Sequence, residues 1–144
     1  MKEQNFKNHA QYVVGYHLII ALATIALLIG SFVNLYHSVY DEANLYSASL
    51  ICLVAVILCL HFWYIRSFPL RAQDRAIRAE EQLRHFILTG KPLDSRLRMS
   101  QIIALRFASD AEFPGLAGQA AETGMRSADI KKAIQNWRPD YNRV

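Results

Sequence analysis

Two long apolar runs dominate the pattern of hydrophobic and polar positions along the chain. Residues 13–35 and 45–65 contain no Asp, Glu, Lys or Arg, although the 144 residues include 16 basic and 12 acidic side chains. About 20 apolar residues in a helix span a hydrocarbon core of about 30 Å, whereas a helix on a soluble core keeps a charged face. The pattern therefore predicts transmembrane helices at residues 13–36 and 45–66, paired as an antiparallel hairpin within residues 13–65.

Small residues in both runs predict close packing of the two helices. In the first run, Ala26, Gly30 and Asn34 are spaced four residues apart and form one row. Such rows let helices approach closely in lipid. In the second run we expect the same role for Ser47, Ala48, Ser49 and Ala55.

A juxtamembrane helix is predicted within residues 67–90, with an interruption at Ser67 to Pro69 and its strong part from Leu70 to Leu88. Proline lacks a backbone donor and kinks or breaks a helix. Beyond it, pairs of acidic and basic residues four apart favour a helix that ends at Gly90. These expected pairs are Asp74 with Arg78, Glu80 with Arg84, and Glu81 with His85.

The apolar positions of this juxtamembrane helix repeat at spacings of 4, 3, 4 and 3. That repeat is typical of a coiled-coil seam, although it extends for fewer than three heptads. We therefore predict an oligomer interface, called the seam below, formed by Ala72, Ala76, Ala79, Leu83 and Phe86.

Residues 91–144 predict a small subdomain of three short helices, at residues 101–107, about 110–123 and 128–137. Ser109 to Glu112 has the form of a capping box for the second helix. Phe107, Phe113 and Trp137 are the expected centre of a small core. With residues 1–12 as a polar lead-in, the predicted fold class is all-α, a transmembrane hairpin followed by a helical tail.

The charge distribution predicts the orientation of the hairpin. The loop between the two runs carries Asp41 and Glu42 and no cation, whereas five arginines lie within about 20 residues after the second run. Loops rich in Lys and Arg stay in the cytoplasm, so both termini and the whole tail are expected there. Tyr and Trp gather at both membrane surfaces, and the predicted interface residues are Tyr12, Tyr16, Trp63, Tyr64, Tyr36, Tyr40, Tyr46, Arg66 and Arg71.

Two histidines are candidate ligands for a haem or a metal ion. His17 and His61 each lie a few residues inside the tail-side end of a predicted span, at similar depth in an antiparallel hairpin. Histidines on facing helices can bind haem or metals, but polar residues at the membrane surface more often stay hydrated. No cofactor or metal is therefore expected. Cys52 and Cys59 lie seven residues apart on one helix and cannot form a disulfide.

The tail also fits the spacing of a helix-turn-helix through Ala120, Gly124, Met125 and Ile130. Lys131 and Lys132 would lie on the second helix, where a DNA-reading helix carries cations. The stretch has no arginine cluster for base reading, so nucleic acid is an unlikely partner. Polar residues of the spans offer another reading, an oligomeric pore lined by Thr24, Ser31, Asn34, Ser47 and Ser49.

Several stretches resemble a family of small bacterial membrane proteins without an assigned activity. The resemblance covers nearly the whole chain and implies two spans with a basic cytoplasmic tail, in the bacterial inner membrane. It supplies no catalytic residue. The matching stretches are QNFKNH (4–9), QDRAIRAEE (73–81), LTGKPL (88–93), LRFASD (105–110) and the ending IKKAI…W (130–137).

No sequence signature of an enzyme occurs in the chain, and no small-molecule substrate is evident. The expected function is a non-enzymatic, self-associating scaffold or an accessory subunit of a membrane complex, with the bilayer and further copies of the chain as partners. A homo-oligomeric channel and a membrane-tethered DNA-binding regulator remain as alternatives.

Overall fold

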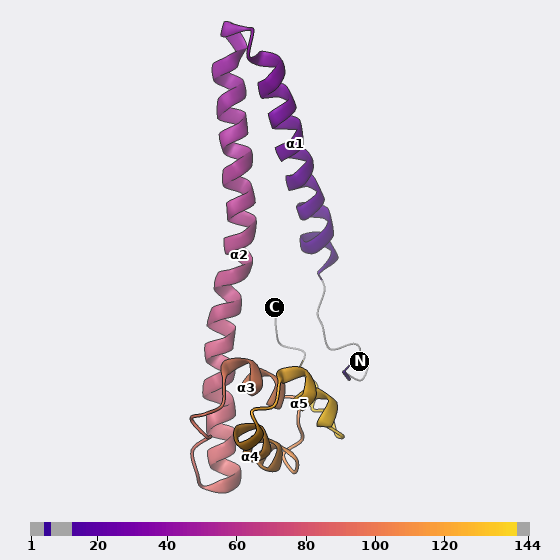
Figure 1. The fold of residues 1–144 in the computed structure, drawn as a ribbon, viewed down its shortest axis with the longest axis vertical. Coiled ribbons are helices and arrows are strands. Elements are labelled where there is room, and N and C mark those ends of the chain that lie inside the picture. Colours follow the sequence, from indigo (N-terminus) through magenta and orange to yellow (C-terminus); the bar gives the residue numbers. More distant parts are fainter. Residues whose placement is uncertain (1–4, 7–12, 141–144) are drawn as a thin grey trace. The chain divides into compact units, whose positions relative to one another are not determined.

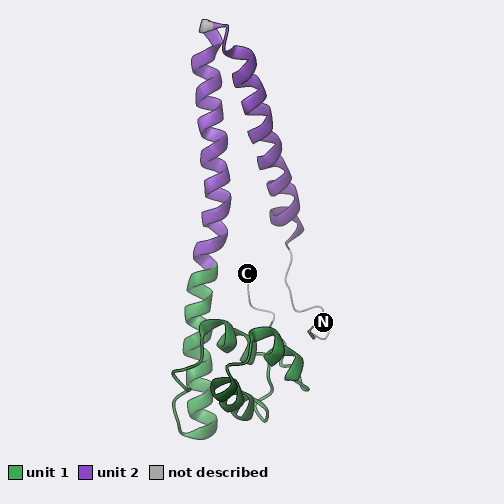
Figure 2. Cartoon of the chain, viewed as in Figure 1, with its two compact units in different colours: residues 1–11, 70–144 green, residues 12–69 purple. Residues whose placement is uncertain are grey.

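The computed structural model describes residues 5–6 and 13–140, and these residues fold into helices without a regular strand. The predicted all-α class is therefore confirmed. The chain divides into two compact units, residues 12–69 and residues 1–11 with 70–144 (Figure 2). Helix α2 (Glu42–Thr89) contributes residues to both units (Figure 1).

The unit of residues 12–69 is built from two long apolar helical segments. A π-helical turn, η1 (Gly15–Ile20), leads into α1 (Ala21–Ser38), and α2 follows after a turn at residues 39–41. This turn is shorter than residues 37–44, which the predicted helices left between them. Asp41 stabilises it, since its carboxylate accepts hydrogen bonds from the Ala43 backbone N–H (3.2 Å) and the Asn44 side chain (2.6 Å).

The antiparallel segments of this unit meet through small side chains and one aromatic pair. Ala48, Cys52 and Ala55 of α2 are buried, as are Ser31 and Ser38 of α1. The role expected for Ala48 and Ala55 is confirmed, whereas Ser47 and Ser49 are exposed. The predicted row on the first helix is wrong, because Ala26, Gly30 and Asn34 are all exposed.

Near the other end of the helix pair, Tyr16 of η1 packs against α2 and forms a hydrogen bond with it. Its ring stacks on Phe62 with centroids 4.6 Å apart, and its hydroxyl donates a hydrogen bond to the Phe62 carbonyl at 2.5 Å. The contact face of the first helix therefore begins at a tyrosine and continues through hydroxyl residues.

Pro69 does not break the helix, because α2 continues through this residue. A proline inside a helix removes one backbone hydrogen bond and crowds one carbonyl. The turns before and after Pro69 keep their own bonds, so a helix of 48 residues tolerates the loss.

The other unit packs three short helices around one core. These are α3 (Met99–Leu105), α4 (Phe113–Thr123) and α5 (Ser127–Ala133). Phe107 and Phe113 are fully buried, and Trp137 packs against them with its ring 5.1 Å from that of Phe107. The expected core is confirmed. Gly124 ends α4 in the left-handed conformation (φ 64°), where glycine is favoured.

Helix α5 ends four residues earlier than expected. Ile134 is extended, and the chain then pairs with the segment after α3 through a bridge between Ala108 and Trp137. Arg138 N–H donates to the Phe107 carbonyl at 2.8 Å, and Ser109 N–H donates to the Asn136 carbonyl at 3.1 Å. This extended run places Trp137 on the core, which a continued helix would not do.

The predicted capping box at Ser109 to Glu112 is also wrong. Glu112 instead accepts hydrogen bonds from the backbone N–H groups of Gln135 (3.2 Å) and Asn136 (3.0 Å). Its carboxylate thus satisfies two backbone N–H groups of the turn that follows α5, more than 20 residues away. Asp110 is used in a second long-range contact, with Arg84.

Candidate functional site

Residues 70–89 of α2 present two nearly opposite faces within their unit. One face is buried or half-buried and includes Leu70, Asp74, Ile77, Glu81 and Arg84. With 3.6 residues per turn, these positions share one side of the helix. We call this set the docking face.

Arg84 is the centre of the docking face. Its guanidinium donates to the carboxylates of Glu81 (3.0 Å) and Asp110 (2.7 Å) and to the Ala108 carbonyl (2.7 Å). It also lies over the ring of Phe113, 4.5 Å from the centroid. Only 10% of its side chain is exposed. One arginine therefore ties α2 to the segment after α3 and to the first residue of α4.

Burial in this arrangement is unfavourable for the charged form of the Glu81 carboxyl. Burial raises the pKa of its carboxyl above the ordinary value of 4.5, and the hydrogen bond and charge of Arg84 oppose the rise. The Glu81 side chain is only 8% exposed. Desolvation disfavours the ionised form of a carboxyl, so the ion pair with Arg84 only partly offsets the loss of water.

The predicted pairs four residues apart are replaced by other contacts. Among the described residues, Arg84 pairs with Glu81 and Asp110 and not with Glu80. His85 does not pair with Glu81. Its Nδ1 lies 2.9 Å from the Lys91 carbonyl, and its ring packs edge-on against Phe113. The tertiary contacts of the docking face therefore override local helix pairing.

The seam forms the other face of the same helix segment. Ala72, Ala76 and Ala79 are exposed, and Leu83 and Phe86 are 61% and 55% exposed. The adjacent Ile87 is 72% exposed. Scattered apolar residues are normal on a surface, but a contiguous row of them indicates an interaction site. The core of the tail does not use this row.

The two candidate ligand histidines do not occupy one facing position. The α2 residue that meets η1 is Phe62, stacked on Tyr16. His61 is exposed and borders a hollow with Tyr64, Ile65 and Phe68, whereas His17 Nδ1 lies 3.0 Å from the Val13 carbonyl. The described residues hold no group of three or more His, Cys, Asp or Glu side chains suited to a metal ion.

The residues of the candidate helix-turn-helix contribute mainly to the core. Ala120 and Ile130 are fully buried, and Met125 packs against the same cluster. Lys131 is half-buried with its ammonium 5.7 Å from the centroid of the Phe107 ring. Since α5 has only seven residues, it offers little length for reading a groove.

The hydroxyl groups of the candidate pore lining bond to their own helices. Thr24 donates to the Ile20 carbonyl (2.7 Å), and Ser31 donates to the Leu28 carbonyl (2.8 Å). Ser47 and Ser49 bond in the same way to residues three positions earlier. Helical Ser and Thr often make such bonds, so these groups need no water-filled pore.

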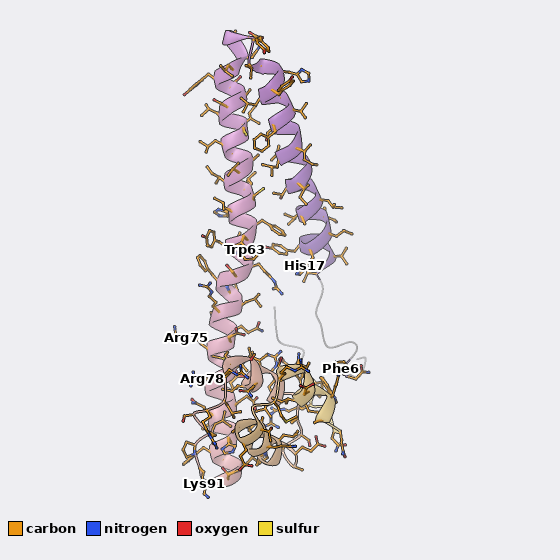
Figure 3. The ribbon with its side chains drawn as sticks, in the orientation of Figure 1. Phe6, His17, Trp63, Arg75, Arg78 and Lys91 are labelled. Carbon is orange, nitrogen blue, oxygen red and sulfur yellow. The ribbon has the colours of Figure 1, made fainter. Side chains whose placement is uncertain are left out.

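The predicted interface aromatics are mostly exposed. Tyr36, Tyr40 and Tyr46 lie near the turn at residues 39–41, and Trp63 and Tyr64 lie toward the other end of the apolar part of α2. Tyr16 is half-buried on Phe62, Arg66 is half-buried and Arg71 is exposed. Figure 3 shows Trp63 and His17 at similar heights on their helices. Tyr12 lies outside the described residues.

Replacement of Arg84 by Gln is expected to destabilise the tail by about 3–5 kcal/mol, because it leaves the buried Glu81 carboxylate without its cation. Denaturant unfolding followed by Trp137 fluorescence measures the change. The control is Arg78→Gln, which alters an exposed arginine of the same helix and should change stability by about 0.5 kcal/mol or less. Equal effects of the two variants would refute the role of Arg84.

Replacement of Glu81 by Gln should remove one pH-dependent component of tail stability. Because the folded-state pKa of Glu81 is raised, its contribution is full below pH 4.5 and is lost as the pH rises through that raised pKa. The variant should therefore gain stability relative to the wild type across this window, as measured by urea unfolding at several pH values.

Asp94→Asn is the control of opposite sign for the Glu81 experiment. Hydrogen bonds from Arg96 lower the pKa of Asp94 to about 2. Its stabilising contribution is present above pH 3.8 and is lost as the pH falls toward 2. If both variants shift stability in the same direction, the assigned environments are wrong.

Comparison with known proteins gives a family but no described activity. No curated protein and no solved structure matches this chain. The model of a family of unknown function, DUF6526, matches residues 1–144. The chain therefore belongs to this family of unknown function along its whole length.

Proposed function

We propose that this chain is a non-enzymatic protein of the bacterial inner membrane that self-associates through the seam and serves as a scaffold or accessory subunit. In this proposal α1 and the first part of α2 cross the bilayer, and both termini lie in the cytoplasm. The exposed seam, on the face of α2 opposite the docking face, is the observation that carries self-association.

The membrane part of the proposal is supported by two helices that are long and apolar enough to span a bilayer. Their most apolar 18-residue windows have mean hydropathies of 2.4 and 2.3, and only 6% and 17% of these windows are buried. A core helix of a soluble protein would be mostly buried. The absence of cations from the loop and the arginines after the second run favour the proposed orientation.

The self-association part is supported by how the tail divides the surface of α2. The docking face is already covered by the core of the same chain, whereas the seam keeps a regular apolar repeat in the open. A water-exposed apolar row gains free energy when a partner covers it. A second copy supplies the same repeat and is the simplest matching surface.

The alternatives receive less support from the geometry. The hydroxyls of the proposed pore lining are bonded to their own helices, and the short α5 directs Lys131 toward a core ring. The described residues hold no group of three or more His, Cys, Asp or Glu side chains suited to a metal ion. The scaffold proposal uses the features that remain.

The orientation predicts opposite labelling of two exposed positions. Tyr40→Cys, in the turn, should react with a membrane-impermeant maleimide added to spheroplasts with intact inner membranes. Lys91→Cys, in the tail, should react only after lysis. Both variants carry Cys52→Ala and Cys59→Ala as a common background. Labelling of both positions in intact spheroplasts, or the reverse pattern, would reject the proposed topology.

The seam predicts that Ala76→Glu weakens self-association by at least about tenfold, since it places a charge in an apolar interface. The matched control is Arg78→Glu, which changes the neighbouring exposed surface and should leave self-association nearly unchanged. Energy transfer between donor- and acceptor-labelled full chains in lipid vesicles measures both. Equal loss in the two variants would show that the interface has been assigned to the wrong face.

A further inference from the structure

We propose that the second copy binds in parallel and in register, so that Arg75 of each chain forms an ion pair with Glu80 of the other. This inference rests on the proposed self-association and specifies its geometry. It concerns residues 70–89 of α2 and assigns a role to two exposed charges that the docking face does not use.

The positions of the two charges follow from the spacing of the seam. If the residues of a heptad are lettered a to g with a and d at the interface, Ala76 and Leu83 occupy a, and Ala72, Ala79 and Phe86 occupy d. Arg75 is then at g and Glu80 at the next e. In a parallel coiled coil these two positions flank the interface and approach each other between chains.

Membrane insertion favours the parallel arrangement. In every copy with the proposed topology, α2 leaves the bilayer on the side where the tail lies and runs in the same direction. Neighbouring α2 helices therefore leave the membrane side by side with the same polarity. A symmetric pair of this kind contains the contact between Arg75 and Glu80 twice.

Within one chain, Arg75 and Glu80 cannot satisfy each other. They are five residues apart, and side chains on a helix meet at spacings of three and four. Neither residue takes part in an ion pair among the described residues. Glu80 borders a shallow groove that also contains Arg138, but no ion pair joins them.

The folded tail does not cover the helix positions that this pairing needs. Leu70, Ile77 and Arg84 occupy b, and Asp74 and Glu81 occupy f, so the docking face lies away from the interface positions. In Figure 3, Arg75 and Arg78 project from the side of α2 away from α3, α4 and α5. Alanine at three interface positions allows the two helices to approach closely, which brings flanking charges within reach.

A charge exchange tests the inference in the full chain. Arg75→Glu and Glu80→Arg each place like charges opposite each other at two symmetric contacts. Each should raise the dissociation constant about tenfold at low salt, and less at 0.5 M salt, where the Debye length is short. The double variant carrying both changes should recover at least half of that loss, because it restores both pairs with exchanged signs.

The measurement is energy transfer between donor- and acceptor-labelled chains, diluted in lipid vesicles to vary the protein density. Arg78→Glu is the control, since it makes the same charge change at position c, away from the interface. Rescue in the double variant alone supports the register. A double variant as weak as the single ones, or an Arg78→Glu variant equal to Arg75→Glu, overturns it.

The failure of this inference is distinguishable from the failure of the proposed function. If Ala76→Glu abolishes energy transfer while both charge reversals are silent, the chain self-associates but not in this register. If Ala76→Glu and the charge reversals are all silent, the seam is not an interface and both proposals are wrong. Circular dichroism of each variant confirms that its helices are intact.

Discussion

The tail of this protein depends on one buried arginine. Arg84 lies on α2, yet its guanidinium binds Asp110, the Ala108 carbonyl and the ring of Phe113, all in segments that fold around a separate core. An arginine offers five donors in a rigid plane and can hold several acceptors at once. The contact fixes which side of α2 the core covers. It also places Glu81 where burial raises the pKa of its carboxyl.

Covering one side of a helix defines the other side. Ile77, Glu81 and Arg84 face the core. The residues of the seam, which are Ala72, Ala76, Ala79, Leu83 and Phe86, therefore remain exposed to solvent. Two acidic residues of the predicted helix pairs are turned away from their expected partners as well, because Glu81 is buried against Arg84 and Asp74 is half-buried. The docking contact thus creates the surface on which the proposed function depends.

The hairpin follows a different physical rule. Its two helices meet through alanine, cysteine and serine side chains and through the stacked pair of Tyr16 and Phe62. Small side chains allow the backbones of two helices to approach closely. The hydroxyls of Thr24, Ser31, Ser47 and Ser49 donate to carbonyls of their own helices.

The sequence by itself determined the features that depend on residue type and local spacing. Apolar runs without charge identified the two long helices, glycine located the end of α4, and aromatic residues identified the core of Phe107, Phe113 and Trp137. The apolar row of the seam was also identified from its repeat, because exposed and buried faces of a helix obey the same period; its role as an interface stays a prediction.

Only the tertiary structure decided which partners the polar residues take. Asp110 and Glu112 fit a local capping box, but they bind Arg84 and the turn after α5, 26 and more than 20 residues away. The apolar row of the first helix was misassigned for a related reason, since several rows on one helix have compatible spacing. Local pattern lists the groups that can interact, whereas the pairing among them depends on which segments the fold brings together.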